Sequence, residues 1–269
     1  MKKLDRFVAK HSKGATGAAV GLWCGLSVLA QALWDWPLLP TLLVYFAGVF
    51  SCLLFIGSCY GRLLKVPMEA IKNDCDPYPY LQETWEQMTY SAYPSTKQMI
   101  TMNHALALQM AGELEKAQAL LESINIDKYR ITAQTKVAYY NNRADLCFML
   151  GQYQEADIWY TKTVQLFHDL KPGKMKEQLR PAIEANRALH HFCIGEYERT
   201  LQVLSQAKPK YMAERVENAM MYGRTYLALG EPEKAKKPLR FVVENGNKLY
   251  FATEAKELLE KINTEETKL

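Results

Sequence analysis

The chain of 269 residues lacks the motifs that usually mark a catalytic or metal-binding centre. It contains no phosphate loop, no dinucleotide fingerprint, no nucleophile elbow and no HExxH sequence. Its six cysteines form no CxxC pair and no other metal-ligand spacing, and scattered free thiols are typical of a reducing compartment. We therefore expect a protein that is not an enzyme and that holds no cofactor and no metal ion.

The histidines and paired acids do not change this expectation. His190 and His191 are adjacent, so on a helix their side chains point about 100° apart and make a poor joint metal site. Glu113 and Glu115 fall in a turn and at a helix start, where carboxylates favour the helix dipole. We interpret these residues as structural.

A basic excess is also missing from most of the chain. The net charge is +4, but residues 1–65 hold seven Lys and Arg and only two acids, so the remainder is close to neutral. A nucleic-acid-binding domain normally carries a basic balance or patch. We therefore expect no nucleic-acid partner.

Two long uncharged runs dominate the N-terminal part. A basic start, residues 1–14, precedes an apolar run from Ala15 to Trp34, and a second run extends from Leu38 to Gly61. Each is long enough to cross a bilayer as a helix. Lys and Arg flank the pair but not the turn, so the positive-inside rule predicts a cell-membrane hairpin with both termini in the cytoplasm. A cleaved signal peptide ending near Ala30–Ala32 is the alternative.

Glycines recur at four-residue intervals in both runs. Gly17, Gly21 and Gly25 share one face of the first helix, and Gly57 and Gly61 do so in the second. Such spacing permits close packing of membrane helices. We expect this packing within the hairpin, with an intramembrane protein partner as the alternative.

A repeated skeleton occupies the rest of the chain. A small residue is followed seven positions later by glycine, and five positions after that by another small residue. The first small sites are Ala105, Ala144, Ala188 and Gly223, and the glycines are Gly112, Gly151, Gly195 and Gly230. The small sites let two antiparallel helices approach, and glycine takes the positive φ that ends the first helix. The pattern predicts an all-α solenoid of about four helix pairs.

The segments GELEKA, GQYQEA, GEYERT and GEPEKA, each with its upstream small residue, resemble the tetratricopeptide repeat family. The resemblance covers about Ser95 to Asn245. We expect helix pairs at 95–111 and 114–124, 130–150 and 153–170, 176–194 and 197–206, and 210–229 and 232–245. The expected domains are a basic N-terminus at 1–14, a hairpin at 15–65, a linker and capping helix at 66–94, a solenoid at 95–262 with a final capping helix at 248–262, and a frayed tail at 263–269.

The family resemblance also suggests a binding surface. In such solenoids the first helix of each pair lines the concave face, and asparagine stands two residues before three of the four small sites. The resemblance places there Asn103, Asn142, Asn186, Asn141, Asp145, Met102, Leu106, Phe148, Met149, Leu189, Phe192 and Arg224. Amides can hold a peptide backbone, and methionine gives an adaptable apolar floor. The asparagines could instead only bridge neighbouring repeats.

These observations predict a two-span membrane anchor that carries a cytoplasmic repeat domain. Its expected function is to bind a protein or peptide as a scaffold, adaptor or assembly factor. The alternative is a sensor or accessory subunit of a membrane transporter or channel, contacted through Gly17, Gly21 and Gly25.

Overall fold

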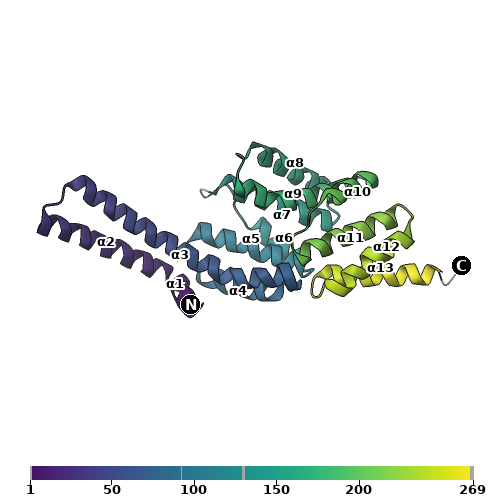
Figure 1. Ribbon diagram of the computed structural model, residues 1–269, viewed down its shortest axis with the longest axis horizontal. Coiled ribbons are helices and arrows are strands. Elements are labelled where there is room, and N and C mark those ends of the chain that lie inside the picture. Colours follow the sequence, from purple (N-terminus) through teal and green to yellow (C-terminus); the bar gives the residue numbers. More distant parts are fainter. Residues whose placement is uncertain (1, 92, 129–130, 267–269) are drawn as a thin grey trace. The chain divides into compact units, whose positions relative to one another are not determined.

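The computed structural model describes residues 2–91, 93–128 and 131–266, and within these ranges it contains only helices and no strand (Figure 1). The all-α prediction is therefore confirmed. The chain divides into two compact units, the first formed by Met1–Pro67 with Gln82–Ile100 and the second by Met68–Leu81 with Thr101–Leu269. The expected linker and capping segment, residues 66–94, is thus shared between the two units.

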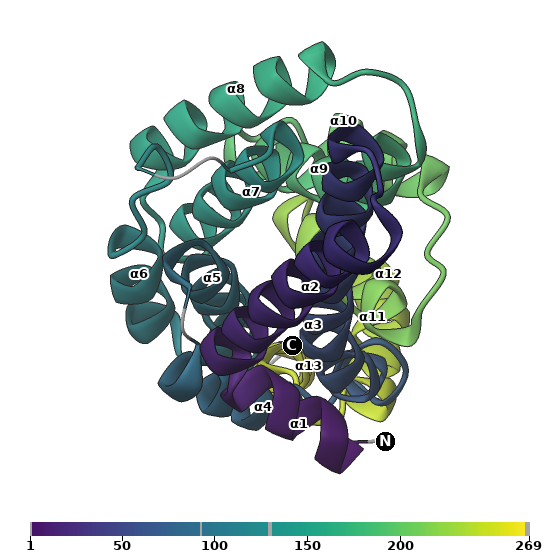
Figure 2. The same cartoon turned by 90° about the vertical axis from the view of Figure 1, so that its left-hand side faces the viewer.

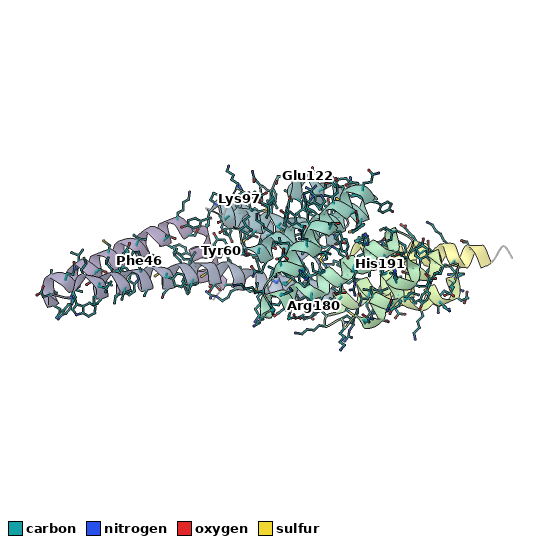
Figure 3. The ribbon with its side chains drawn as sticks, turned by 90° about the horizontal axis from the view of Figure 1, so that it is seen from above. Phe46, Tyr60, Lys97, Glu122, Arg180 and His191 are labelled. Atoms are coloured by element: carbon teal, nitrogen blue, oxygen red, sulfur yellow. The ribbon has the colours of Figure 1, made fainter. Side chains whose placement is uncertain are left out.

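The first unit contains a helical hairpin. Its helices are α1 (Lys2–Lys10), α2 (Ser12–Trp34), most of α3 (Leu38–Asp74), most of α4 (Tyr78–Tyr90) and the start of α5 (Pro94–Met110). Both α2 and α3 are long and apolar enough to span a membrane. Large apolar side chains such as Phe46 point away from the hairpin and are exposed (Figure 3).

The glycines of the hairpin do not pack as expected. A Cβ atom added at Gly17, Gly21 or Gly25 would meet nothing within 4 Å. The close approach lies elsewhere, because a Cβ atom added at Gly48 of α3 would lie 2.2 Å from ring atoms of Trp23 in α2. The expectation that the α2 glycines hold the hairpin together is therefore wrong, since the contact is made by a tryptophan ring lying over one glycine.

The second unit consists of successive helix pairs. They are α5 with α6 (Leu114–Glu122), α7 (Ala133–Met149) with α8 (Tyr153–Asp169), α9 (Lys174–Cys193) with α10 (Tyr197–Gln206), and α11 (Met212–Ala228) with α12 (Pro232–Asn245). In this unit α8 lies on the outer side of the row of helix pairs and α7 on its inner side (Figure 2). These bounds agree closely with the predicted pairs, although the predicted start at residue 130 lies outside the described residues.

The repeat skeleton forms the core of this unit. The small sites of the first and second helices are buried, and the residue four positions further on, a leucine in three repeats and Tyr160 in the second, packs between the helices. Each repeat glycine has a positive φ, from 71° to 84°. In every repeat the residue after glycine donates its N–H five residues back, as Glu113 does to Leu108 O at 2.9 Å, which is the Schellman ending of a helix.

Two segments pack beside the last repeat of the second unit, since Asp76 pairs with Lys248 at 2.7 Å and Cys75 shares a core cluster with Ala255. Asp76 accepts a hydrogen bond from the backbone N–H of Tyr78 at 3.1 Å, as expected for a residue that caps α4. The last helix, α13 (Tyr250–Glu266), packs Ala255 and Ile262 into the core beside α12. It continues four residues beyond the expected end at 262 because no helix-breaking residue follows; residues 267–269 lie outside the described part of the tail.

Candidate functional site

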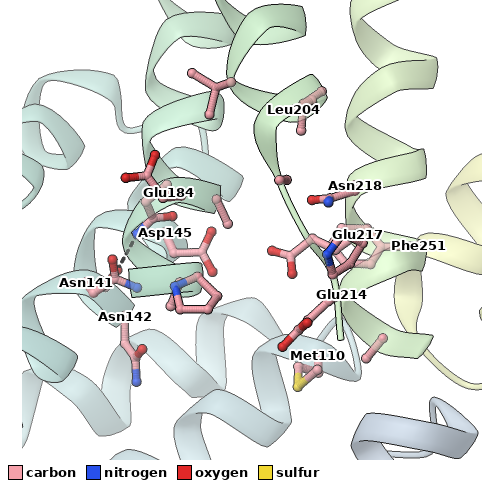
Figure 4. Close-up of a pocket in the computed structure, with 18 of the residues that line it drawn as sticks. Met110, Asn141, Asn142, Asp145, Glu184, Leu204, Glu214, Glu217, Asn218 and Phe251 are labelled. Atoms are coloured by element: carbon pink, nitrogen blue, oxygen red, sulfur yellow. Dashed lines mark hydrogen bonds between the residues drawn. The ribbon is translucent and has the colours of Figure 1, made fainter. Parts of the chain in front are cut away.

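A groove of about 470 Å³ opens on the inner side of the helix pairs (Figure 4). It is lined by α5, α7, α9 and α11, the first helices of the four repeats, together with the end of α10, the segment that follows α10 and the start of α13. Apolar side chains such as Leu106, Met149 and Phe251 form part of its wall. The groove is therefore a concave site of mixed apolar and polar character.

Six of the sequence-predicted residues line this groove. They are Leu106, Asn141, Asn142, Asp145, Met149 and Asn186. Leu189 and Arg224 line a smaller adjoining pocket. Residues one and five positions after the small site of a repeat recur on this surface, as Asp145 and Met149 do in α7, because they lie beside the packed face of the helix.

The other predicted residues are not part of the groove surface. Met102 and Phe148 are buried in the core, and Phe192 packs on the ring of Tyr197 with centroids 5.6 Å apart. Each lies three or four residues from a small site, so each shares the packed face of its helix. Asn103 is half-buried and does not line the cavity.

The asparagine row divides into two roles. Asn186 is buried and its Nδ2 donates to the backbone oxygen of Asn141 at 2.9 Å, so it bridges α9 to α7. Asn142 is only half-buried, lines the groove and makes no hydrogen bond with another described residue. Asn186 thus bridges neighbouring repeats, which is the alternative role expected for the asparagines. The amide of Asn142 instead faces the groove.

Sequence reasoning missed several groove residues. Gln109, Glu184, Tyr250 and Phe251 all line the cavity. The spacing of Gln109 from Ala105 gave no signal for the groove, because four residues from a small site is also the spacing of the packed face. The aromatic pair at the start of α13 carried no signal, because only the packing of that helix against the last repeat brings it to the groove.

Two carboxyl groups face each other across the groove. Asp145 projects from α7 and Glu217 from α11, and Figure 4 shows them pointing toward one another. Burial raises the pKa of Asp145 to about 6, although a hydrogen bond from Gln109 opposes the rise. Burial also raises the pKa of Glu217 to about 8, and the neighbouring charges of Asp145 and Glu214 add to the rise. At neutral pH the two groups therefore hold about one proton between them.

The charge of Arg224 lowers the pKa of Asp145, but the ion pair of this arginine is made elsewhere. Arg224 lies on the same helix as Glu217 but directs both ends of its guanidinium to Glu254 of α13, with Nε 2.8 Å from Oε1. A bidentate arginine–carboxylate pair of this kind is strong and geometrically fixed. The guanidinium of Arg224 is therefore already paired with Glu254.

Among residues 2–91, 93–128 and 131–266, no cluster of three or more His, Cys, Asp or Glu side chains could hold a metal ion. Two facing carboxyls remain in the groove, with amides and apolar side chains around them. This arrangement can accept hydrogen bonds, can bind cations and can contact apolar side chains of a ligand.

The curved array of helix pairs defines the second unit as a helical-repeat domain. Residues 98–123 match the family model of the tetratricopeptide repeat, which supports the resemblance of the helix pairs to that repeat. The match covers α6 and most of α5, the first helix pair. No curated protein and no solved structure gave a significant match to the chain. The repeat indicates a role in protein–protein interaction.

Proposed function

We propose that the chain is a membrane-anchored cytoplasmic scaffold, adaptor or assembly factor that binds an extended segment of a partner protein in the groove. The observation that carries the proposal is the groove itself, about 470 Å³, formed by the first helices of all four repeats. Asn142 supplies an amide with no partner among the described residues, and Leu106 and Met149 supply apolar contact. The hairpin would hold this site at a membrane surface and raise its effective concentration near membrane partners.

Contacts within the first unit support a retained hairpin. Arg6 of α1 forms ion pairs with Glu83 and Glu86 of α4, the latter at 2.9 Å, and Asp5 of α1 pairs with Arg62 of α3 at 2.6 Å. The segment before the first span thus contacts the segment after the second span, as a hairpin requires if both ends lie on one side of the membrane. Removal of a signal peptide would break these contacts, so they favour the anchor.

The test is photo-crosslinking in intact membranes. A benzophenone amino acid at Asn142 should capture a partner, whereas the same amino acid at the exposed Glu198 on α10 should not capture it. The captured partner should be lost when Met149→Glu places a charge on the groove wall. Equal capture from Asn142 and Glu198, or capture unaffected by Met149→Glu, would move the binding surface away from the groove.

The second candidate function is that of an accessory subunit of a membrane transporter or channel. It is favoured by the open space around Gly17, Gly21 and Gly25, which leaves a flat helix face without a contact inside the hairpin. Gly21→Leu should then dissociate a membrane complex in native gel electrophoresis. Val20→Phe, which enlarges an exposed side chain about 100° around the helix, should leave the complex intact.

A further inference from the structure

The polar groups of the groove are matched to one kind of ligand. The charged residues along its lining are Asp145, Glu184, Glu214, Glu217, Arg180 and Lys208. Four of the six are acids, so the groove as a whole carries a negative balance. This balance is not a property of the repeat, because the chain outside the N-terminal part is close to neutral.

Three of these six charged groups already have partners. Arg180 pairs with Glu177 at 2.8 Å, Glu184 pairs with Arg187 at 2.6 Å, and the carboxylate of Glu214 accepts the backbone N–H of Lys210 at 2.6 Å. Lys208 is exposed at the rim. The unsatisfied charge of the groove is therefore concentrated on two facing acids in its interior.

Those two acids lack cationic partners. Asp145 receives a hydrogen bond from the amide of Gln109, and Glu217 receives none from any described residue. The charged groups around them are Glu214 and Arg224 on α11, Glu184 and Arg187 on α9, and Glu254 on α13, and both arginines are paired with these glutamates. A cation placed between the acids would offset the cost of burying their charges and the smaller repulsion between them.

Two buried side-chain amides give independent evidence for a ligand that donates hydrogen bonds. Gln109 and Asn141 line the groove and are 3% and 7% exposed, and the side-chain oxygen of each has no hydrogen-bond partner among the described residues. Both unpartnered atoms are acceptors, and burying an acceptor without a hydrogen bond is unfavourable. The two unpartnered amide oxygens and the two facing acids together favour a ligand that has several N–H donors and a positive charge.

We propose that the partner segment inserts a lysine or arginine side chain between Asp145 and Glu217, with apolar residues on either side of it. The ammonium or guanidinium group meets the carboxylates and the oxygens of Gln109 and Asn141. The flanking apolar residues contact Leu106, Met149 and Phe251. This inference rests on the proposed function, because it names the chemistry of the segment that the groove binds.

The test uses the full chain in phosphatidylcholine nanodiscs, whose neutral surface does not attract cationic peptides. The probes are capped, fluorescent nine-residue peptides of leucine and serine whose central residue is lysine, arginine, norleucine or glutamate. Norleucine matches the length of lysine without its charge. We expect the lysine or arginine peptide to bind at least tenfold more tightly than the norleucine peptide, measured by fluorescence anisotropy.

Isosteric variants assign the preference to the two acids. Glu217→Gln and, separately, Asp145→Asn should reduce the lysine preference below threefold, whereas Glu198→Gln, the same change on the outer face, should leave it unchanged. Circular dichroism checks that each variant is folded. A norleucine or glutamate peptide that binds as tightly as the lysine peptide would overturn the cationic ligand but leave peptide binding in place. Failure of every peptide to bind would overturn both proposals.

Discussion

The side chain of Asn186 reaches from α9 to the backbone of α7, where its Nδ2 lies 2.9 Å from the carbonyl oxygen of Asn141. This contact joins two repeats and is buried from solvent. Asn186→Ala should therefore lower the free energy of unfolding by about 1–2 kcal/mol, because a buried hydrogen bond and its packing are lost. Chemical unfolding of the full chain in detergent micelles measures the change.

The control for this prediction is Asn142→Ala. Asn142 lines the groove and makes no hydrogen bond with another described residue, so its loss should change stability by less than about 0.5 kcal/mol. The same substitution should weaken partner binding. Equal effects of the two substitutions on stability would show that the asparagine row has a single role.

Close packing at Gly223 gives a second prediction. A Cβ atom at this position would lie 2.5 Å from Cδ2 of Leu239, which is fully buried in the core of the last repeat. Gly223→Ala should destabilise the protein by about 1–3 kcal/mol through overpacking. Adding Leu239→Val, which removes one methylene from the crowded side chain, should recover part of this loss in the same unfolding assay. A neutral Gly223→Ala would mean that the helices can move apart at no cost.

The pH dependence of stability reports on Glu217. Its pKa is about 8 in the folded protein and lies near 4.5 when unfolded, so between these values the folded state holds a proton that the unfolded state has released. Stability contributed by this group therefore falls as pH rises from about 5 to 8. Glu217→Gln should remove that fall and stabilise the protein at pH 8 by about 1–3 kcal/mol, less than the full shift implies because the side chain is partly exposed.

Thermal unfolding at pH 5 and pH 8 measures this effect. Glu198→Gln serves as the control, because its carboxyl is exposed on α10 and the substitution makes the same change in charge. A Glu217→Gln variant that keeps the full pH dependence of the native chain would show that Glu217 is ionised throughout this range.

Membrane topology gives the last prediction. If the hairpin spans the membrane with both ends inside, Asp35→Cys in the turn between α2 and α3 should react with a membrane-impermeant maleimide added to intact cells. Lys10→Cys should react only after the membrane is opened, because it precedes the first span. Labelling of both positions from outside, or of neither, would contradict the two-span arrangement.

The repeat architecture was predictable because its signals are local. The signals are a glycine at the end of each first helix, small residues seven positions before and five positions after it, and a large residue four positions further on, and all of them act within one helix pair. The structure accordingly places Gly151 and its equivalents at positive φ and buries Ala144 and its equivalents. Met102, Phe148 and Phe192 were assigned to the wrong face, although their spacing from the small sites already put them on the packed side.

The amino-acid sequence by itself determined the helix pairs, their order and the two apolar runs, because backbone conformation and helix amphipathicity depend on residues within a few positions of one another. Only the tertiary structure decided which groups face the groove. Asp145 and Glu217 belong to different repeats, and the turns and packing of the helices between them bring their carboxyls together. Their raised pKa values follow from that shared burial, which no local pattern encodes.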